Sequence, residues 1–154
     1  MQKIKQYKDI NLDLINTKTI SNIKFSFIKP SDIHGLGLFT NSMIKKRTIL
    51  GFLDGQVMPW AQYNEIMKNT DLGYFNSYIF MEWNALDKNT LLVRAFRTKY
   101  SYINHSRKPN VAIKYNSMRV EAIKDITKNN EILIDYRKEP LNDNYIKNYG
   151  KEFL

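Results

Sequence analysis

The sequence predicts a mainly β domain made of several small sheets with few short helices. Many short apolar segments rich in Ile, Val, Phe and Tyr are separated by turn residues, which is the pattern of short strands. Segments with helical spacing are few and short. The chain has 154 residues, of which 43% are hydrophobic and 13% aromatic, so it can bury one core and is not expected to be disordered.

The N-terminal part of the chain opens with an ambiguous segment and then a strand. Residues 1–20 are polar and weakly patterned, and both an α-helix and an extended arm remain open for them. The alternation of Ile23, Phe25 and Phe27 then predicts a half-buried strand. A break at residues 30–32, which include a proline, ends this strand before a glycine-containing loop.

The remaining elements follow from the same signals. Strands are predicted at residues 48–53, 75–82, 91–94, 111–115, 118–123 and 132–136. Helical spacing predicts helices over residues 60–69 and within residues 142–154. Residues 111–115 and 118–123 have the pattern of a hairpin. In the polar turn after it, Asn129 or Asn130 is expected to adopt a positive φ.

The chain is basic, with 24 Lys and Arg against 15 Asp and Glu and a formal charge of +9. Such a charge favours polyanionic partners, including nucleic acid, chromatin and acidic protein surfaces. Lys, Ile and Asn are all abundant, which a bias in nucleotide composition would also produce. Both explanations of the charge stay open at this stage.

Several classes of chemistry are excluded by residue types that the chain lacks. It contains no cysteine, which rules out disulfides, thiolate zinc sites and a cysteine nucleophile. His34 and His105 are its two histidines and fit no metal-binding spacing, so no metal site is predicted. There is no Gly-x-Ser-x-Gly elbow and no dinucleotide fingerprint. No apolar run approaches the ~20 residues of a membrane span, and residues 1–5 lack the apolar core of a secretory signal.

Two segments carry the signal of a functional site. The first runs Tyr100-Ser101-Tyr102-Ile103-Asn104-His105-Ser106-Arg107-Lys108-Pro109-Asn110, and the second Glu131-Ile132-Leu133-Ile134-Asp135-Tyr136. Tyrosine, with a pKa near ~10, is a poor base at neutral pH, but its hydroxyl can position a reactant. The terminal tyrosine therefore suits a reaction that depends on alignment more than on proton transfer.

Together with two earlier blocks, these segments resemble the SET-domain protein lysine methyltransferases. The four blocks, in the family's order, are His34-Gly35-Leu36-Gly37-Leu38-Phe39, Asn76-Ser77-Tyr78-Ile79-Phe80, Ile103-Asn104-His105-Ser106-x-x-Pro109-Asn110 and Glu131-Ile132-Leu133-Ile134-Asp135-Tyr136. The resemblance implies a SET domain over residues 21–138 with a C-terminal pseudoknot formed by the last two blocks. It leaves residues 1–20 as an N-terminal arm and residues 139–154 as a flank that packs on the site.

The resemblance also implies roles for individual residues. S-adenosyl-L-methionine would be the cofactor, and its expected contacts are His34, Gly35, Leu36, Gly37, Tyr102, Asn104, His105 and, in the tail, Tyr145. Tyr136 would be the catalytic tyrosine, and Tyr78 and Ile134 would line the lysine channel with it. An isoleucine two residues before the catalytic tyrosine, where a tyrosine favours fewer methyl groups, predicts di- or trimethylation.

The chain departs from the family in lacking its zinc-binding flanks. Arg107 stands where a cysteine is usual, and no later cysteine cluster exists, which is similar to compact viral and bacterial members. The C-terminal tail is therefore expected to complete the lysine channel, with Tyr145, Tyr149 or Phe153 as the candidate residues.

The expected function is methyl transfer from S-adenosyl-L-methionine to a lysine of a protein, with a histone or a DNA-packaging protein as the expected substrate. Contact with DNA or nucleosomes through the basic surface and a homodimeric state are further expectations. We expect an intracellular protein without membrane association, in the cytoplasm of its source or in a host nucleus if it is viral or from a pathogen. Two alternatives stay open: a catalytically silent SET-like binding module and a small basic nucleic-acid-binding domain.

Overall fold

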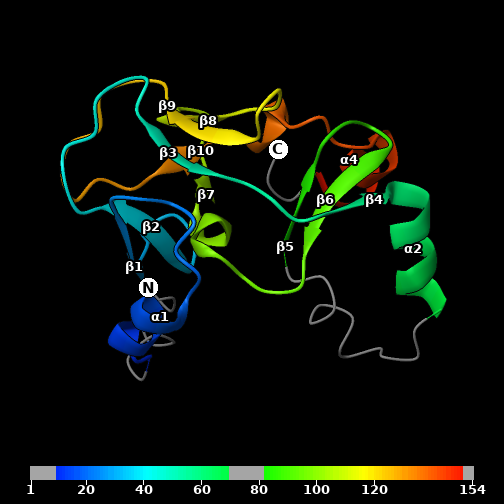
Figure 1. Ribbon diagram of the computed structural model, residues 1–154, viewed down its shortest axis with the longest axis horizontal. Coiled ribbons are helices and arrows are strands. Elements are labelled where there is room, and N and C mark those ends of the chain that lie inside the picture. Colours follow the sequence, from blue (N-terminus) through cyan, green and yellow to red (C-terminus); the bar gives the residue numbers. More distant parts are fainter. Residues whose placement is uncertain (1–9, 70–81, 151–154) are drawn as a thin grey trace.

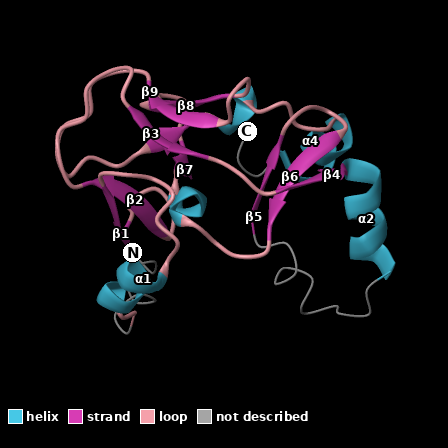
Figure 2. Ribbon diagram, in the orientation of Figure 1, coloured by secondary structure: helices cyan, strands magenta, loops and turns pink. Residues whose placement is uncertain are grey.

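The computed structural model describes residues 10–69 and 82–150, which form four small β-sheets with short helices around them (Figure 1, Figure 2). The α-helices are α1 (Leu12–Lys18), α2 (Trp60–Asn69) and α4 (Asp143–Tyr149), and Lys99–Tyr102 and Tyr136–Lys138 form 3-10 helices. The mainly β class predicted from the sequence is confirmed. Within the described residues no helix is both long and apolar enough to cross a membrane.

The sheets are small and largely antiparallel. The strands are β1 (Ser26–Pro30), β2 (Leu36–Thr40), β3 (Ile49–Phe52), β4 (Gln56–Pro59), β5 (Glu82–Ala85), β6 (Thr90–Arg94), β7 (Asn104–His105), β8 (Val111–Lys114), β9 (Arg119–Ala122) and β10 (Leu133–Ile134). They form the sheets β1-β2, β3-β9-β8, β4-β6-β5 and β10-β7. Only β10 and β7 pair in parallel among these strands.

The parallel pair joins the two segments that carry the functional signal. Leu133 lies opposite Asn104 and Ile134 opposite His105, although the β8-β9 hairpin separates the two strands in sequence. Asn110 strengthens the junction, because its Nδ2 donates to the Glu131 carbonyl at 2.7 Å and its Oδ1 accepts from the Leu133 N–H at 2.8 Å. The expected association of the third and fourth blocks is confirmed.

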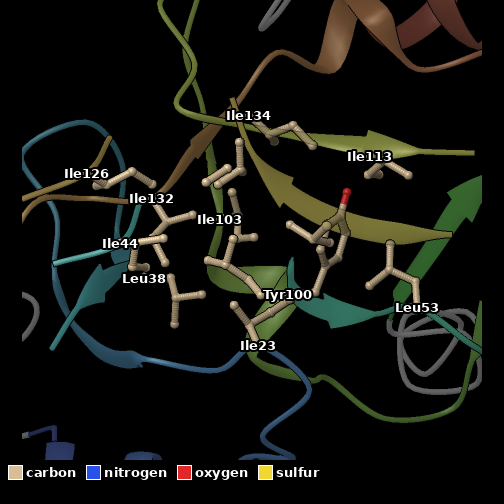
Figure 3. Packing of buried hydrophobic residues seen from close by; sticks show 14 of the residues in the cluster. Ile23, Leu38, Ile44, Leu53, Tyr100, Ile103, Ile113, Ile126, Ile132 and Ile134 are labelled. Carbon is tan, nitrogen blue, oxygen red and sulfur yellow. The ribbon is translucent and has the colours of Figure 1, made fainter. Parts of the chain in front are cut away.

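Two apolar clusters stabilise the arrangement. The larger one packs under the parallel pair and includes Ile23, Leu38, Ile103, Ile132 and Ile134, all at most 3% exposed (Figure 3). A smaller one gathers between the β4-β6-β5 sheet and the helices α2 and α4, which lie beside that sheet at one end of the molecule (Figure 1). Its buried members are Met58, Trp60, Ala85, Leu91, Val93 and Leu141. The site residues described below lie between these two packed regions.

The strand predicted from Ile23 is wrong at its start. β1 begins at Ser26, because Phe25 adopts a left-handed conformation with φ 57° and is 46% exposed. This break shifts the alternation by one residue, so that Ser26 and Ile28 point inward in place of Phe25 and Phe27. A one-residue shift of this kind exchanges the two faces of a strand.

Most other elements match their predictions. The helix over 60–69 and the hairpin at residues 111–123 are confirmed. Of the two alternatives for residues 1–20, a helix is found over Leu12–Lys18, which is α1. Asn129 has the expected positive φ, at 67°. The strand at 56–59 was not predicted. Of the strand predicted at 75–82, all but Glu82 lies outside the described residues. The last strand ends at Ile134 and not at Tyr136, since the Asp135 side chain accepts the Arg137 N–H and caps a 3-10 turn.

Candidate active site

The glycine loop is tied to the parallel pair by one carboxylate and one amide. Asn104 Nδ2 donates to Glu131 Oε1 at 2.8 Å and to the carbonyls of His34 and Leu36 at 3.1 and 3.4 Å. Ser31 Oγ, at the other side of the loop, donates to Glu131 Oε2 at 3.0 Å. The loop is thereby held at both of its ends.

Both glycines of the loop are required, for different reasons. Gly35 has φ 53°, a conformation that side chains rarely adopt. Gly37 lies within β2, where a Cβ atom would come within 2.3 Å of Glu131 Oε1 and 2.9 Å of the Ser31 Cβ. Because Gly37 has no side chain, the backbone can approach the Glu131 carboxylate closely.

His105 places the backbone of Tyr136. The Tyr136 N–H donates to His105 Nδ1 at 3.1 Å, and the two rings lie 5.3 Å apart. A nitrogen that accepts a hydrogen bond carries no proton, so the imidazole proton resides on Nε2. The histidine predicted to hold the cofactor therefore also positions the predicted catalytic tyrosine.

The Tyr136 hydroxyl is fixed by a second contact from the same motif. It donates to the Ile103 carbonyl at 2.7 Å, so the hydroxyl proton is engaged there and the hydroxyl acts towards a reactant through its oxygen. Burial raises the pKa of Tyr136 well above its ordinary value, and the charges of Glu139 and Tyr145 act in the same direction. The hydroxyl is therefore neutral at physiological pH and suited to positioning, as expected from the sequence.

Tyr136 borders a cavity of about 310 Å³ with aromatic and acidic walls. The lining residues come from β5, the two 3-10 helices, the segment after them and α4: they are Glu82, Trp83, Tyr100, Ser101, Tyr136, Glu139, Leu141 and Tyr145. The Trp83 and Tyr145 rings meet edge to face with their centroids 5.1 Å apart. Aromatic walls attract cations through their π faces.

The C-terminal tail contributes directly to this cavity. Helix α4 begins after Asn142, whose side chain accepts the Asn144 N–H at 2.9 Å. The helix places Tyr145 against Trp60, Trp83 and Tyr149, with ring centroids 5.8, 5.1 and 5.3 Å away. Tyr149 is 56% exposed, and Phe153 lies outside the described residues. Of the two candidate tail aromatics that the structure describes, Tyr145 lines the cavity and Tyr149 does not.

Among the described residues, two other predicted site residues, Tyr102 and Ile134, do not line the Tyr136 cavity. Tyr102 lines a separate open groove with residues of α1 and Phe96. Ile134 is buried in the larger core cluster and faces a smaller cavity of about 100 Å³. Tyr78 lies outside the described residues. The groups brought together around Tyr136 are therefore the backbone of the Asn-His motif, the tail aromatic Tyr145 and two acidic residues.

Three residues of the site have no role that the sequence motifs predict. Glu131 belongs to the fourth block, and its hydrogen bonds with Ser31 and Asn104 fasten the glycine loop. Trp83 and Glu139 belong to no block, and they reach the cavity through contacts between distant segments. A signal for Glu139 existed in its spacing, because a residue three positions after Tyr136 lies one 3-10 turn away.

Asp135, which directly precedes Tyr136, pairs with Arg137, which directly follows it. Its carboxylate accepts from Arg137 Nε at 2.8 Å and from Arg137 Nη2 at 2.7 Å. Asp135 is 4% exposed. Mainly through these hydrogen bonds, Arg137 lowers the pKa of Asp135 from its ordinary 3.8 to about 2. Because the folded pKa lies below the unfolded one, this contribution to stability is complete above about pH 4 and is lost as the pH falls towards about 2.

We therefore expect Asp135→Asn to lower the free energy of unfolding by about 2 kcal/mol at neutral pH. The difference between the two proteins should shrink as the pH is lowered through the range from about 4 to about 2. Urea unfolding followed by circular dichroism at several pH values measures it. A constant difference across that range would show that the carboxylate charge is not the cause.

The described residues contain no cluster of three or more His, Cys, Asp or Glu side chains that could hold a metal ion. The site offers hydrogen-bonding and aromatic groups. They can cradle a ligand against backbone, orient a polar reactant at a tyrosine hydroxyl and stabilise a positive charge.

Comparison with known proteins extends these observations. A family model described as the SET domain matches residues 35–137. The structure is similar to that of the Neurospora SET domain protein DIM-5, a histone lysine methyltransferase, with a TM-score of 0.54, 21% identity and coverage of 71% of this chain and 50% of that one. No curated protein sequence matches the chain.

Two further similar structures come from larger assemblies. One is the apo ctPRC2 complex with mutations in Ezh2, with a TM-score of 0.59, 18% identity and coverage of 76% of this chain and 15% of that one. The other is a humanised mutant of the Chaetomium thermophilum Polycomb Repressive Complex 2 bound to an inhibitor, with a TM-score of 0.56, 20% identity and the same 76% and 15% coverage. At these identities the likeness concerns the fold, and the chain spans half or less of the proteins it matches.

Proposed function

Because the chain belongs to the SET-domain family, we propose that it transfers a methyl group from S-adenosyl-L-methionine to the side-chain amine of a lysine in a protein. The observation that carries the proposal is the Tyr136 hydroxyl, which is fixed to the Ile103 carbonyl at the wall of an aromatic cavity. This placement joins the family's catalytic tyrosine to a site that can receive a long, cationic side chain.

The residues of the glycine loop fit the proposed cofactor. Gly35 supplies the left-handed turn of the loop, Gly37 lets the Glu131 carboxylate approach the loop backbone, and Asn104 donates to the loop carbonyls. When bound, S-adenosyl-L-methionine supplies a methyl group activated by a positively charged sulfur. Tyr145 and Trp83 provide aromatic faces that favour such a cation.

The residues around Tyr136 would perform the remaining work of the reaction. The Tyr136 oxygen, held by its hydrogen bond to Ile103, would accept a hydrogen bond from the amine and align its lone pair. Trp83, Leu141 and Tyr145 would cover the methylene groups of the lysine and exclude water. Exclusion of water disfavours the charged ammonium and so favours the neutral, nucleophilic amine.

The first test of this function measures cofactor binding and methyl transfer separately. Calorimetry with S-adenosyl-L-methionine should show binding at a single site. Core histones and a denatured whole-cell protein extract, incubated with the protein and the tritiated cofactor, should incorporate the label into lysine. Binding without any labelling of either substrate would contradict the enzymatic proposal and favour a silent SET-like module.

A histone or a similar basic DNA-packaging protein is the substrate class that we propose. DIM-5, to which the structure is similar, is described as a histone lysine methyltransferase. The formal charge of +9 would not steer the protein towards a basic tail, but it favours docking on the DNA that such a tail accompanies. Labelling of histones should therefore be stronger on nucleosomes than on free histones and should fall with salt.

The charge alone also motivates the second function, a nucleic-acid-binding domain. This function predicts DNA binding with a steep salt dependence and no cofactor binding. A Kd for S-adenosyl-L-methionine too weak to detect, together with salt-sensitive DNA binding, would favour it over methyl transfer.

The number of methyl groups transferred is expected to exceed one. The expectation rests on the family pattern, in which a tyrosine two residues before the catalytic tyrosine favours fewer methyl groups, whereas this chain has Ile134 at that position. Mass spectrometry of the labelled lysine should show di- or trimethylated product at long incubation times. Product that stays monomethylated would contradict this prediction and leave the transfer itself intact.

A further inference from the structure

Glu139 is a carboxylate that the motifs do not account for and that borders the Tyr136 cavity. It follows the 3-10 helix Tyr136–Lys138 directly, and its N–H donates to the Tyr136 carbonyl at 3.1 Å. Its Oε1 accepts from the Tyr100 hydroxyl at 3.2 Å. Tyr136 therefore holds the backbone of Glu139, and Tyr100 holds its carboxylate.

The charges around Glu139 leave its carboxylate without a cation of its own. Arg94, the basic residue that faces it from β6, forms an ion pair with Glu82. Glu82 also accepts from the Thr98 N–H at 2.9 Å, so Glu82 and Arg94 neutralise each other and Arg94 forms no ion pair with Glu139. Among the described residues no ion pair to Glu139 is found, and Tyr100, Tyr115 and Tyr136 are the other titratable groups that face it.

Burial is the main influence on the ionisation of this carboxyl group. It raises the pKa of Glu139 from its ordinary 4.5 to about 7, against smaller opposing effects of Tyr100, Arg94, the Ala85 N–H and Asn84. A carboxylate that is close to half ionised at neutral pH can both take up and release a proton there. Asn84, which is 1% exposed, lies next to this carboxylate and opposes the rise in its pKa through its side-chain amide.

We propose that Glu139 receives the substrate lysine ammonium in the Tyr136 cavity and accepts its proton. This inference rests on the proposed methyl transfer and names the group that prepares the nucleophile. One N–H bond of the ammonium breaks, its electron pair stays on the nitrogen, and the proton forms an O–H bond with the Glu139 carboxylate. The neutral amine is then the nucleophile, and the proton leaves to solvent through the open cavity.

The other groups that line the cavity are less suited to this role. Tyr136 donates its proton to the Ile103 carbonyl, and burial keeps its hydroxyl neutral. Tyr100 is likewise buried and donates to Glu139. Glu82 already serves Arg94 and Thr98. Glu139 is therefore the carboxylate of the described cavity wall that retains capacity to bind a cation and a proton.

The test compares the pH dependence of kcat/KM for the wild-type protein, Glu139→Gln and Asp143→Asn. The wild-type rate should rise with pH through about 7 and then level off until the lysine itself titrates near ~10.4. Glu139→Gln should be about 100-fold slower at neutral pH, should lack the inflection near 7 and should recover as the pH approaches ~10.4. Asp143→Asn removes an exposed charge on α4 and should retain the wild-type profile.

A second variant gives a result that does not depend on tolerance of Glu139→Gln. Tyr100→Phe removes the hydroxyl that stabilises the ionised carboxylate, so the inflection in the pH profile should move to higher pH. An unchanged inflection in both variants, with the wild-type protein active, would overturn the role of Glu139 and leave methyl transfer standing.

A direct titration separates this inference from the proposed function. The side-chain carboxyl resonances of 13C-labelled protein, followed by NMR without any substrate, should include one that titrates near pH 7 and is absent from Glu139→Gln. Its absence from the wild-type spectrum overturns the inference. A wild-type protein that shows this resonance but labels no lysine in the histone and extract assay overturns the proposed function, and the role of Glu139 with it.

Discussion

Replacement of Tyr136 by phenylalanine is expected to slow methyl transfer by about 1,000-fold while leaving the protein folded. The hydroxyl reaches the cavity and is held in place there by its 2.7 Å hydrogen bond to the Ile103 carbonyl. Phenylalanine keeps the ring beside His105 and loses only the oxygen that orients the amine. The loss should therefore appear in kcat more than in cofactor affinity.

Single-turnover labelling and calorimetry measure these two quantities for Tyr136→Phe. Tyr149→Phe is the matched control, because it removes a tyrosine hydroxyl from the neighbouring helix α4, where the side chain is 56% exposed. That variant should transfer methyl groups at the wild-type rate. A Tyr136→Phe protein with an undiminished rate would show that the hydroxyl does not take part in the reaction.

Gly37→Ala is expected to weaken the binding of S-adenosyl-L-methionine by about 10- to 100-fold, which corresponds to about 1.4–2.8 kcal/mol. The added Cβ would lie 2.3 Å from Glu131 Oε1, and the carboxylate would have to move. Glu131 would then lose its hydrogen bonds from Asn104 and Ser31, which hold the two sides of the cradle. Calorimetry gives the change in Kd, and circular dichroism checks that the variant is folded.

A double-mutant cycle tests whether the clash with Glu131 is the cause. Glu131→Ala removes the obstructing carboxylate, so the addition of Gly37→Ala in that background should cost much less affinity than in the wild-type protein. Equal effects of Gly37→Ala in both backgrounds would place its cause elsewhere, for example at the Ser31 Cβ, which lies 2.9 Å from the new atom.

Much of this site could be predicted because its parts are local motifs. The glycines need an unusual backbone conformation or a close approach, and both requirements are met at Gly35 and Gly37. The helix over residues 60–69 has apolar side chains at helical spacing and follows a proline, which marks its start. The pairing of the Asn-His segment with the last strand followed from the family's block order and not from any local signal.

The parts that could not be predicted depend on contacts between distant residues. Phe25 reads as an inward strand residue, but the chain turns at this position through a left-handed conformation that no local signal marks. Tyr102 belongs to the Asn-His segment, yet the 3-10 helix that carries it directs it to a groove beside α1. Glu139 becomes a site residue only because Tyr100, 39 positions earlier, lies across from it.

The parallel pairing of β7 with β10 has a consequence for how the protein is made. A growing chain that ends at Ile123 already contains the glycine loop and the Asn-His pair, but it lacks Glu131, which fastens the loop, and Tyr136. Contacts between segments so far apart form slowly and require the intervening chain to be complete. The site should therefore arise as one of the final events of folding, and a ribosome-bound or C-terminally shortened chain should have no cofactor cradle to protect it from proteolysis.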